Sequence, residues 1–378
     1  MPLRLFKGIL LLLAVLFCGA AHAAETPCSP DSVRISLLTC SPGPEIFELY
    51  GHEAVRVSGR VGGREVDQVF NYGVFDYNAP GFVYRFVKGE TDYYVDVMPT
   101  QWFIETYMRQ GRRVVEQVLP LSPGEAIEYY GMLLTDMQPE NRSYRYKYFS
   151  NNCATRLLDK VEQMPSARNC PVTDLSRPSG TTYRELIRKY NTGYPWYQLG
   201  IDLALGSMID EPVTVRQTMF IPMELARYYG KQEVLVDGRG DVRKSPTPWY
   251  LSPVFAAWML FACVAVMLLC GRRWRAIYSF WFLLCGLAGT LVCYLVFLSS
   301  HEGTSPNWLA WWLNPLWFIP AVTVWVRPLG YFTRYAAAVP GIATLLLLAA
   351  WPLLPQCGNP AFFPLMATTV ILSLRLPR

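Results

Sequence analysis

The chain has 378 residues, of which 52% are hydrophobic, and its mean hydropathy is +0.17. This composition is too apolar for an ordinary soluble domain and too mixed for a pure membrane bundle. The net charge of +5 comes largely from arginines in loops between apolar stretches, so it does not indicate nucleic acid binding.

The N-terminus has the pattern of a secretory signal peptide. The segment MPLRLFKGILLLLAVLFCGAAHAAE places basic residues before an apolar run and ends that run with Ala-His-Ala. This pattern predicts a signal peptide over residues 1–23 and a mature chain that begins at Ala24. A retained anchor helix is the alternative, but the run is short for the roughly 20 residues that a span requires.

Two regions of different composition follow. Residues 24–248 are polar, aromatic and mixed in charge, and they predict one extracytoplasmic domain. Residues 249–378 predict a membrane domain with five transmembrane helices. A span needs about 20 residues, a length that the first four apolar stretches approach and the fifth does not. The stretches are Trp249–Cys270, Ala276–Ser299, Trp308–Val326, Ala336–Leu354 and Ala361–Leu374.

The charges of the loops predict the topology. GRRWR, RPLGYFTR and RLPR follow the first, third and fifth stretches, whereas HEGTSPN and QCGNP after the second and fourth contain no Lys or Arg. By the positive-inside rule, the arginine-rich loops are cytoplasmic and the large domain lies outside the cytoplasm. We therefore expect a multi-pass membrane protein in contact with the lipid bilayer.

Of the ten cysteines, Cys18 belongs to the predicted signal peptide, and the other nine divide by compartment. Those in or beside the apolar stretches are expected to be small packing residues. Five others face the oxidising side, and because five is odd, at least one thiol stays free or pairs with another chain. The pairing cannot be deduced from the sequence. These five are Cys28, Cys40, Cys153, Cys170 and Cys357.

The segment SNNCATRLL makes Cys153 a candidate nucleophile. Asn151 or Asn152 is a suitable N-cap, and apolar residues then recur at helical spacing. The thiol is therefore predicted in the first helical turn, where the N–H groups and the helix dipole favour a thiolate. The same N–H groups can bind an oxyanion. The alternative is a buried structural cysteine.

His52 is the strongest candidate for a base, since one of the three histidines of the chain belongs to the signal peptide. Two β-rich runs flank a Gly-Gly pair after His52, which predicts a hairpin with a two-residue turn. In that register Val61 is opposite Arg64, and Asn71 lies diagonal to His52 on the same face. Asn71 could then orient the imidazole. A slip of one residue would instead present Tyr72 or Phe70.

Metal and cofactor sites are not indicated. Histidines are scarce and there is no C-x-x-C pair, which argues against zinc. Two basic regions and one apolar region have open interpretations. The basic residues either contact a phosphate group or are solvated at the surface, and they are Lys88, Arg112 and Arg113. The apolar region, residues 196–212, either lines a groove for lipid or forms part of the hydrophobic core.

Several segments resemble the Lnb-type lipoprotein N-acyltransferases: YGHEAVRV, FNYGVFD, FVKGETDYYV, YRYKYFSNNCATR and HEGTSPNWLAWWLNPL. The resemblance covers nearly the whole mature chain, in order. It implies an α+β papain-like (permuted NlpC/P60-like) thiol domain with an antiparallel sheet, followed by an all-α bundle of five membrane helices. It also implies His52 as base and Cys153 as nucleophile. The supporting residues that it implies are Asn71, Tyr72, Asp76, Asn152 and Arg156.

The loop that contains His301 and Glu302 has two interpretations. These two residues could join the active site or bind a lipid headgroup. Alternatively, the loop is only a polar tip beside an interfacial belt of tryptophans. The belt would consist of Trp308, Trp311, Trp312 and Trp317.

The resemblance implies a two-stage acyl transfer. The donor would be a membrane phospholipid, the intermediate a Cys153 thioester, and the acceptor the α-amine of a diacylglyceryl-cysteine lipoprotein. The order of His before Cys also resembles the lecithin:retinol acyltransferase group, an analogy of mechanism only. The alternatives are a membrane-anchored thiol peptidase or amidase acting on cell-wall peptides, and a non-catalytic scaffold in which Cys153 is bridged, for instance to Cys170.

Overall fold

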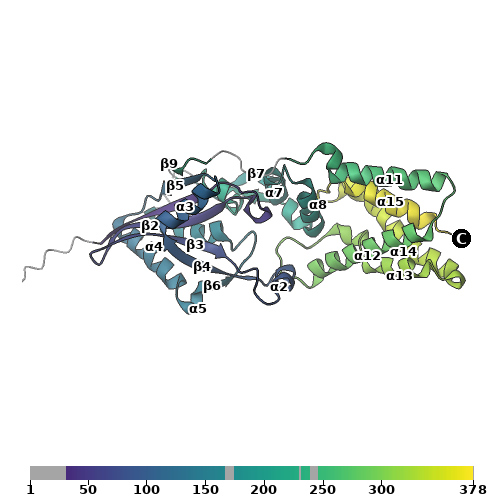
Figure 1. The fold of residues 1–378 in the computed structure, drawn as a ribbon, viewed down its shortest axis with the longest axis horizontal. Coiled ribbons are helices and arrows are strands. Elements are labelled where there is room, and N and C mark those ends of the chain that lie inside the picture. Colours follow the sequence, from purple (N-terminus) through teal and green to yellow (C-terminus); the bar gives the residue numbers. More distant parts are fainter. Residues whose placement is uncertain (1–30, 167–173, 230, 239–245, 378) are drawn as a thin grey trace, which may run out of the picture.

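A computed structural model describes residues 31–166, 174–229, 231–238 and 246–377. The chain folds into an α+β half followed by an all-helical half, as predicted (Figure 1). The predicted signal peptide lies outside the described residues.

The N-terminal half is built on one antiparallel sheet. The sheet has seven strands in the order β6-β4-β3-β2-β1-β5-β9. Neighbouring strands in the sequence often pair directly, which is typical of antiparallel sheets connected by hairpins. The strands are β1 (Ser32–Cys40), β2 (His52–Val61), β3 (Arg64–Val74), β4 (Asp92–Pro99), β5 (Val114–Val118), β6 (Ser143–Arg145) and β9 (Gln232–Val236).

The β2–β3 hairpin has the register predicted from the sequence. Val61 is opposite Arg64, and two glycines connect the strands with φ values of 57° and 75°. Positive φ at both turn positions is typical of the type I′ turn, whose twist matches that of the strands. Because side chains alternate along a strand, this register puts His52 and Asn71 on the same face of the sheet.

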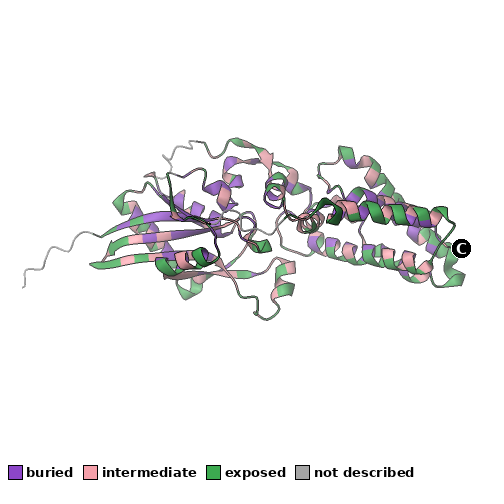
Figure 2. Cartoon of the chain, turned by 45° about the horizontal axis from the view of Figure 1, so that its top comes forward, coloured by how far each residue is buried: buried purple, intermediate pink, exposed green. Residues whose placement is uncertain are grey.

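Helices cover both faces of the sheet. On one face lie α4 (Pro123–Asp136) and α6 (Cys153–Val161), and on the other lies α3 (Thr100–Arg109). Val55 of β2 packs in the core cluster on the α6 side, whereas Ala54 packs in the cluster on the α3 side. The central strands are accordingly buried in Figure 2. Even-numbered residues of β2 therefore face α3.

Shorter elements lie after and beside the sheet, and Figure 1 shows α2, α7 and α8 between the sheet and the helical half. These elements are η1 (Ile46–Glu48), α2 (Phe82–Lys88), α5 (Pro139–Arg142), β7 (Pro178–Thr182), α7 (Tyr183–Tyr190), α8 (Pro195–Ala204), η3 (Ser207–Asp210), β8 (Pro212–Thr214), α9 (Val215–Thr218) and α10 (Pro222–Leu225).

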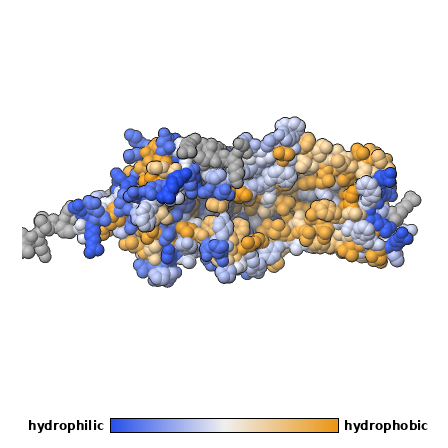
Figure 3. Space-filling view, in the orientation of Figure 1, coloured by the Kyte–Doolittle hydropathy of each residue, from blue (hydrophilic) through white to orange (hydrophobic). Residues whose placement is uncertain are grey.

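The helical half contains two segments that are long and apolar enough to cross a membrane. They are Arg275–Phe297, with 23 residues, and Arg327–Leu353, with 27 residues. At 1.5 Å per residue, a 23-residue helix is about 34 Å long, more than the hydrocarbon core requires. Figure 3 shows that the surface of this half is largely hydrophobic. Its main helices are α11 (Pro253–Leu269), α12 (Arg275–Phe297), α14 (Gly330–Ala350) and α15 (Phe362–Leu374).

The third apolar stretch is not one continuous helix. It is divided into η5 (Trp308–Trp311), η6 (Pro315–Trp317) and α13 (Phe318–Thr323). The Asn314 side chain accepts a hydrogen bond from the N–H of Leu316 at 3.2 Å and so caps a new turn. Proline follows this asparagine and cannot donate the bond that would continue a helix. Hydropathy averages over such breaks and does not detect them.

The tryptophans of this stretch do not all form an interfacial belt. Trp312 and Trp317 are buried in the core of the helical half. Trp312 Nε1 donates to Thr369 Oγ1 at 2.9 Å, and Trp317 Nε1 donates to the Trp312 carbonyl at 2.7 Å. Trp311, by contrast, is 58% exposed. The expectation of a belt is therefore wrong for the two buried residues, whose indole N–H groups have partners inside the protein.

A network of buried charges lies where the two halves meet. Arg184 of α7 forms ion pairs with Asp202 at 2.7 Å and with Asp210 at 2.8 Å, and these carboxylates are almost fully buried. The second carboxylate oxygen of Asp202 accepts a hydrogen bond from Asn359 Nδ2 of the helical half at 3.0 Å. A buried ion pair needs such additional partners to offset desolvation. The network fixes α7 and α8 against the helices.

Candidate active site

Cys153 is the first residue of α6, as the sequence predicted. The Asn152 side-chain oxygen accepts hydrogen bonds from two backbone N–H groups of the first turn, each at 2.9 Å. The Asn152 N–H in turn donates to Thr155 Oγ1 at 2.8 Å. The side-chain nitrogen of Asn152, Nδ2, donates to the backbone carbonyls of Tyr148 and Phe220, at 2.9 and 2.8 Å. These bonds fix the backbone on both sides of the thiol.

His52 and Asn71 are in direct contact. His52 Nε2 lies 2.6 Å from Asn71 Oδ1. Because an amide oxygen only accepts hydrogen bonds, Nε2 carries the ring proton and Nδ1 is left unprotonated. His52 is the first residue of β2 on the α3 face, whereas Cys153 comes from the α6 face. The imidazole and the thiol therefore come from opposite faces of the sheet, and both line one cavity.

One cavity of about 220 Å³ contains both His52 and Cys153. Its wall is otherwise largely aromatic, and two of the aromatic side chains, Phe47 and Phe86, are 57% and 50% exposed. Such a wall suits an apolar chain better than a peptide. The aromatic residues that line the cavity are Phe47, Tyr50, Phe75, Phe86, Tyr93, Tyr146, Tyr148, Tyr197 and Phe220.

Gly73 brings the β3 backbone close to the thiol. Its φ is +86°, and a Cβ added there would lie 3.6 Å from the Cβ of Cys153. A residue with a side chain would be strained in this conformation. The glycine therefore lets the β3 backbone pass close to Cys153 in a left-handed conformation.

Burial makes both reactive groups neutral at pH 7. It lowers the pKa of His52 to about 4; the hydrogen bond that His52 donates to Asn71 opposes this shift and the charge of Arg112 adds to it. Burial also raises the pKa of the Cys153 thiol to about 11, although backbone N–H groups of Glu53, Ala154 and Cys153 itself act in the opposite direction. The N–H groups of the helix end favour the thiolate, as the sequence predicted, but desolvation outweighs them.

A loop from the helical half reaches the segment that precedes Cys153. Glu302 Oε2 accepts hydrogen bonds from the backbone N–H groups of Phe149 and Ser150, each at 3.2 Å, and Glu302 Oε1 accepts one from Ser150 Oγ. In the same loop, His301 Nε2 donates to the Phe86 carbonyl at 2.6 Å. We call residues 299–306 the strap. It connects the helical half to α2 and to the loop that carries the thiol.

Comparison with known protein families gave two matches. Residues 21–189 match the Lnb N-terminal periplasmic domain, and residues 245–376 match the Lnb transmembrane domain. The chain belongs to the Lnb family. The two matches have the order that the sequence predicted, so the α+β half is the periplasmic domain and the helical half is the transmembrane domain. No match was found among curated proteins or among solved structures.

Two other predicted residues of this Lnb protein lie behind the thiol. Tyr72 OH donates to Asp136 Oδ2 at 2.7 Å, and Arg156 Nη2 lies 3.4 Å from the same oxygen. The Arg156 guanidinium also lies over the ring of Tyr144, 4.2 Å from its centre. Neither Tyr72 nor Arg156 lines the cavity. Their contacts join α4, β3 and α6, so they support the position of Cys153 from the core.

Asp76 is the predicted residue that the structure does not bring to the site. It follows β3 in an exposed turn, where its carboxylate accepts a hydrogen bond from the N–H of Asn78 at 2.8 Å. This is a local turn contact of the kind that aspartate commonly makes.

The sequence did not identify a second cavity beside His52. This cavity of about 270 Å³ is lined by His52, Asn71 and Arg112, among others. Arg112 is buried, and it donates to Glu48 Oε1 at 2.6 Å and to the Ser41 carbonyl at 2.8 Å. From the sequence, Arg112 was expected either to contact a phosphate group or to be solvated at the surface. Its burial in the structure excludes the solvated position.

The sequence also did not identify the aromatic wall of the cavity that contains His52 and Cys153. Tyr146 and Tyr148 alternate with charged residues directly before the NNC segment, a period-two pattern that could have indicated a shared face. In the segment 196–212, Tyr197 lines the cavity, and α8 contacts α11 and α12.

Among the described residues, Cys153 and Cys40 are free thiols. Cys28 and Cys170 lie outside the described residues, so the bridge from Cys153 to Cys170 considered for a scaffold falls on a residue that the structure does not describe. Within the described part of the chain, no group of three His, Cys, Asp or Glu side chains is placed to hold a metal ion.

The neutral pair predicts how Cys153 reacts with an alkylating agent. Iodoacetamide reacts with the thiolate, so its rate at Cys153 should rise about tenfold per pH unit from pH 7 to pH 9. A thiolate–imidazolium pair would instead give a rate that hardly changes over this range. The measurement is mass spectrometry of the Cys153 peptide after timed labelling, with exposed Cys357 as the internal reference. A flat profile at Cys153 would contradict the neutral pair.

Proposed function

We propose that this Lnb protein is a lipoprotein N-acyltransferase that uses Cys153 as nucleophile and His52 as base. The donor is a membrane phospholipid, and the acceptor is the α-amine of a diacylglyceryl-cysteine at a lipoprotein N-terminus. The contact between His52 and Asn71 carries this proposal, because His52 lines the same cavity as the free thiol of Cys153.

In the first stage, Cys153 attacks an ester carbonyl of the phospholipid. His52 Nδ1 takes the thiol proton as the carbon–sulfur bond forms, and the N–H groups of Glu53 and Cys153 stabilise the oxyanion. Both N–H groups face the sulfur. The ester carbon–oxygen bond then breaks, and the lysophospholipid leaves with the proton from His52. The acyl chain remains on Cys153 as a thioester.

In the second stage, the α-amine of the lipoprotein attacks the thioester. His52 takes a proton from the amine, an amide bond forms, and the carbon–sulfur bond breaks to return the thiol of Cys153. Asn71 holds the imidazole in the tautomer that both stages need, because its oxygen keeps the proton on Nε2.

The position of the cavity supports a substrate that enters from the membrane. Phe86 of α2 lines the cavity, and the carbonyl of Lys88, at the end of α2, accepts a hydrogen bond from the N–H of Ser300 at 2.8 Å. Ser300 comes shortly after α12, which ends at Phe297 and is one of the two candidate spans. The exposed aromatic side chains at the cavity are therefore near the end of a membrane-spanning helix, where such residues bind the lipid interface.

A thiol peptidase or amidase acting on cell-wall peptides is the second candidate. It would need the same thiol and imidazole, but it would not need an aromatic cavity or a fused transmembrane domain. Peptides are recognised through backbone and polar side-chain bonds, whereas the wall of this cavity is largely aromatic. We therefore favour the lipid substrate.

The proposal also sets the arrangement in the cell. Residues 1–23 are removed as a signal peptide, residues 24–248 form the periplasmic domain, and residues 249–378 cross the inner membrane five times. α11 and α15 are shorter than the two candidate spans, with 17 and 13 residues. They would cross with the help of flanking residues or local thinning of the bilayer.

Mass spectrometry of one lipoprotein N-terminus tests the function. The lipoprotein is made in a host that lacks its own N-acyltransferase and is supplied with the intact protein, with Cys153→Ser or with Cys40→Ala. Cys40 is a matched control because it is a second buried, free thiol of the periplasmic domain that does not line the cavity. We expect triacylated N-termini from the intact protein and from Cys40→Ala, and only diacylated N-termini from Cys153→Ser.

Two other results would contradict the proposal. Triacylated product from Cys153→Ser would show that this thiol is structural. Diacylated product from the intact protein, present in the membrane, would favour the cell-wall peptidase.

A further inference from the structure

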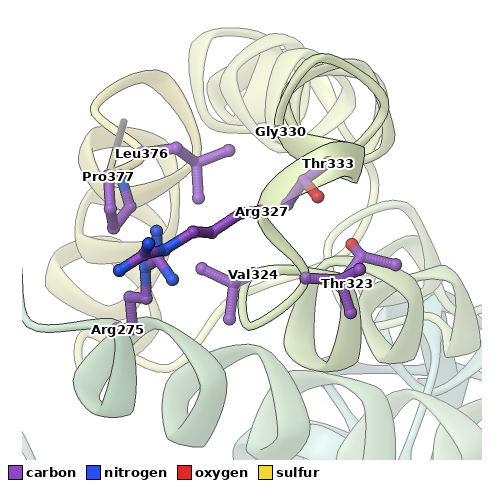
Figure 4. A pocket seen from close by; sticks show the side chains of 9 residues that line it. Arg275, Thr323, Val324, Arg327, Gly330, Thr333, Leu376 and Pro377 are labelled. Carbon is purple, nitrogen blue, oxygen red and sulfur yellow. The ribbon is translucent and has the colours of Figure 1, made fainter.

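The second cavity, which lies beside His52, has no part in the acyl transfer as proposed. Its volume of about 270 Å³ is close to the lower end of the range of roughly 300–1,000 Å³ for ligand pockets. The cavity in Figure 4 has about 310 Å³, but its lining residues, from Arg275 to Pro377, belong to the transmembrane domain. The second cavity, by contrast, adjoins the thiol site, because His52 lines both it and the cavity that contains Cys153.

The two cavities beside His52 share one wall. Asn71 lines the second cavity and not the first, whereas Cys153 lines the first and not the second. The imidazole therefore lies between them, with its Nε2 atom 2.6 Å from Asn71 Oδ1. Two of the shared residues are glycines, which place no side chain between the cavities. The shared residues are Phe47, Gly51, His52, Gly73 and Phe75.

The second cavity lies where β2 and β3 separate. The register of this hairpin ends at the pair of Val55 and Phe70, so the start of β2 and the end of β3 are not registered with each other. Both of these strand ends line the cavity, through His52 and through residues 71–75. The pairing of β3 with β4 is also irregular between residues 71 and 74. An extended chain suits such a strand end, because peptides are commonly bound through main-chain hydrogen bonds beside a strand.

The polar groups of the second cavity favour a neutral ligand. Its charged lining residues form an ion pair, in which Arg112 Nη1 lies 2.6 Å from Glu48 Oε1. A phosphate group would approach the Glu48 carboxylate without a free cation to offset the repulsion. Asn71 Nδ2 donates to no residue that the structure describes, so it can donate to a carbonyl of a ligand. A peptide offers neutral carbonyls of this kind, whereas a phospholipid headgroup brings an anion.

We propose that the second cavity binds the peptide segment that follows the modified cysteine of the lipoprotein acceptor, as an extended chain beside Asn71. This inference rests on the proposed function. In the second stage the α-amine lies at the thioester of Cys153 and at the ring of His52. The peptide that continues from the same cysteine passes the glycines of the shared wall into the second cavity, and the acyl chains stay at the aromatic wall of the first. The residues after the acceptor cysteine thereby contribute to its recognition.

One variant and one control distinguish the two cavities. Val74→Phe adds volume at the wall of the second cavity, and Val74 does not line the first. Val118→Phe makes the same exchange at a β5 residue that is 41% exposed and lines neither cavity. Thermal unfolding in detergent shows whether each variant is folded.

Photo-crosslinking of the full chain in detergent locates the peptide without acyl transfer. The probe is a diacylglyceryl-cysteine peptide with a diazirine on the second residue after the cysteine, and Cys153→Ser is the background for all proteins. We expect adducts, mapped by mass spectrometry, mainly within residues 46–52, 71–75 and 107–112. Val74→Phe should reduce them about five- to tenfold, and Val118→Phe should not. Adducts mainly elsewhere, no adducts, or equal labelling in a folded Val74→Phe variant would overturn the site.

Acyl transfer gives a second readout, with Cys153 intact. We expect kcat/KM for the peptide acceptor to be about tenfold that for diacylglyceryl-cysteine amide, a ratio that Val118→Phe keeps and Val74→Phe lowers to about one. Both acceptors react with the same thioester, so the ratio does not depend on the rate of the first stage. A ratio of one in the intact protein would overturn the peptide site and leave the acyltransferase standing. Transfer to neither acceptor would overturn the proposed function, and the cross-links would still decide where the peptide binds.

Discussion

Replacing His52 with alanine should slow acyl transfer about a thousandfold, because general-base catalysis typically contributes a factor of this order. The loss should appear already in the first stage, since a neutral thiol with its pKa raised to about 11 needs a base before it can attack. The measurement is the rate of triacylation of a synthetic diacylglyceryl-cysteine peptide by the purified protein with phospholipid. Intact-protein mass spectrometry follows the thioester on Cys153 in parallel.

Asn71→Ala provides a graded comparison for this prediction. It leaves His52 in place but removes the oxygen 2.6 Å from Nε2. We expect a loss of about tenfold to a hundredfold, the usual result when a catalytic group is retained but less well oriented. Thermal unfolding of each variant in detergent controls for loss of structure. If His52→Ala forms the thioester as fast as the intact protein, His52 is not the base.

Replacing Glu302 with alanine should reduce the same rate by about tenfold to a hundredfold, although Glu302 does not line the cavity. The variant leaves the N–H groups of Phe149 and Ser150 without the carboxylate that accepts from both. Hydrogen exchange over residues 146–152 should therefore accelerate, whereas exchange in the β2–β3 hairpin should not change. Peptide-level exchange mass spectrometry measures both segments in one experiment.

Two further variants distinguish the loss of the Glu302 hydrogen bonds from the loss of a negative charge elsewhere in the protein. Glu302→Gln keeps one acceptor oxygen and should lose less activity than Glu302→Ala. Glu65→Ala removes a carboxylate whose side chain is 87% exposed, and it should behave as the intact protein does. Unchanged exchange over residues 146–152 in Glu302→Ala would mean that the strap does not hold the thiol loop.

The parts of the site that could be predicted from the sequence are those fixed by local rules. A Gly-Gly pair between two β-rich runs allows one tight hairpin, and that register places Asn71 beside His52. An asparagine before a helical pattern is a reliable N-cap, and this put Cys153 in the first turn of α6.

The parts that could not be predicted depend on contacts between distant segments. The sequence pattern favoured a thiolate at Cys153 because it indicated the start of a helix. It could not indicate how deeply the thiol is buried, and this burial raises the thiol pKa. Arg112 is an ordinary arginine in the sequence, and only the fold places it beside His52. Hydropathy also could not show that the third apolar stretch is broken at Asn314 and Pro315.

The strap has a consequence for biosynthesis. Ser150 emerges from the ribosome 152 positions before Glu302, and α12 lies between them. The N–H groups of Phe149 and Ser150, shortly before Cys153, can therefore donate to Glu302 only after α12 has been inserted into the bilayer. A nascent or proteolytically released periplasmic domain has the thiol and the imidazole but not the strap. In the proposed mechanism such a fragment would be a poor esterase, because the loop before its thiol lacks the hydrogen bonds to Glu302.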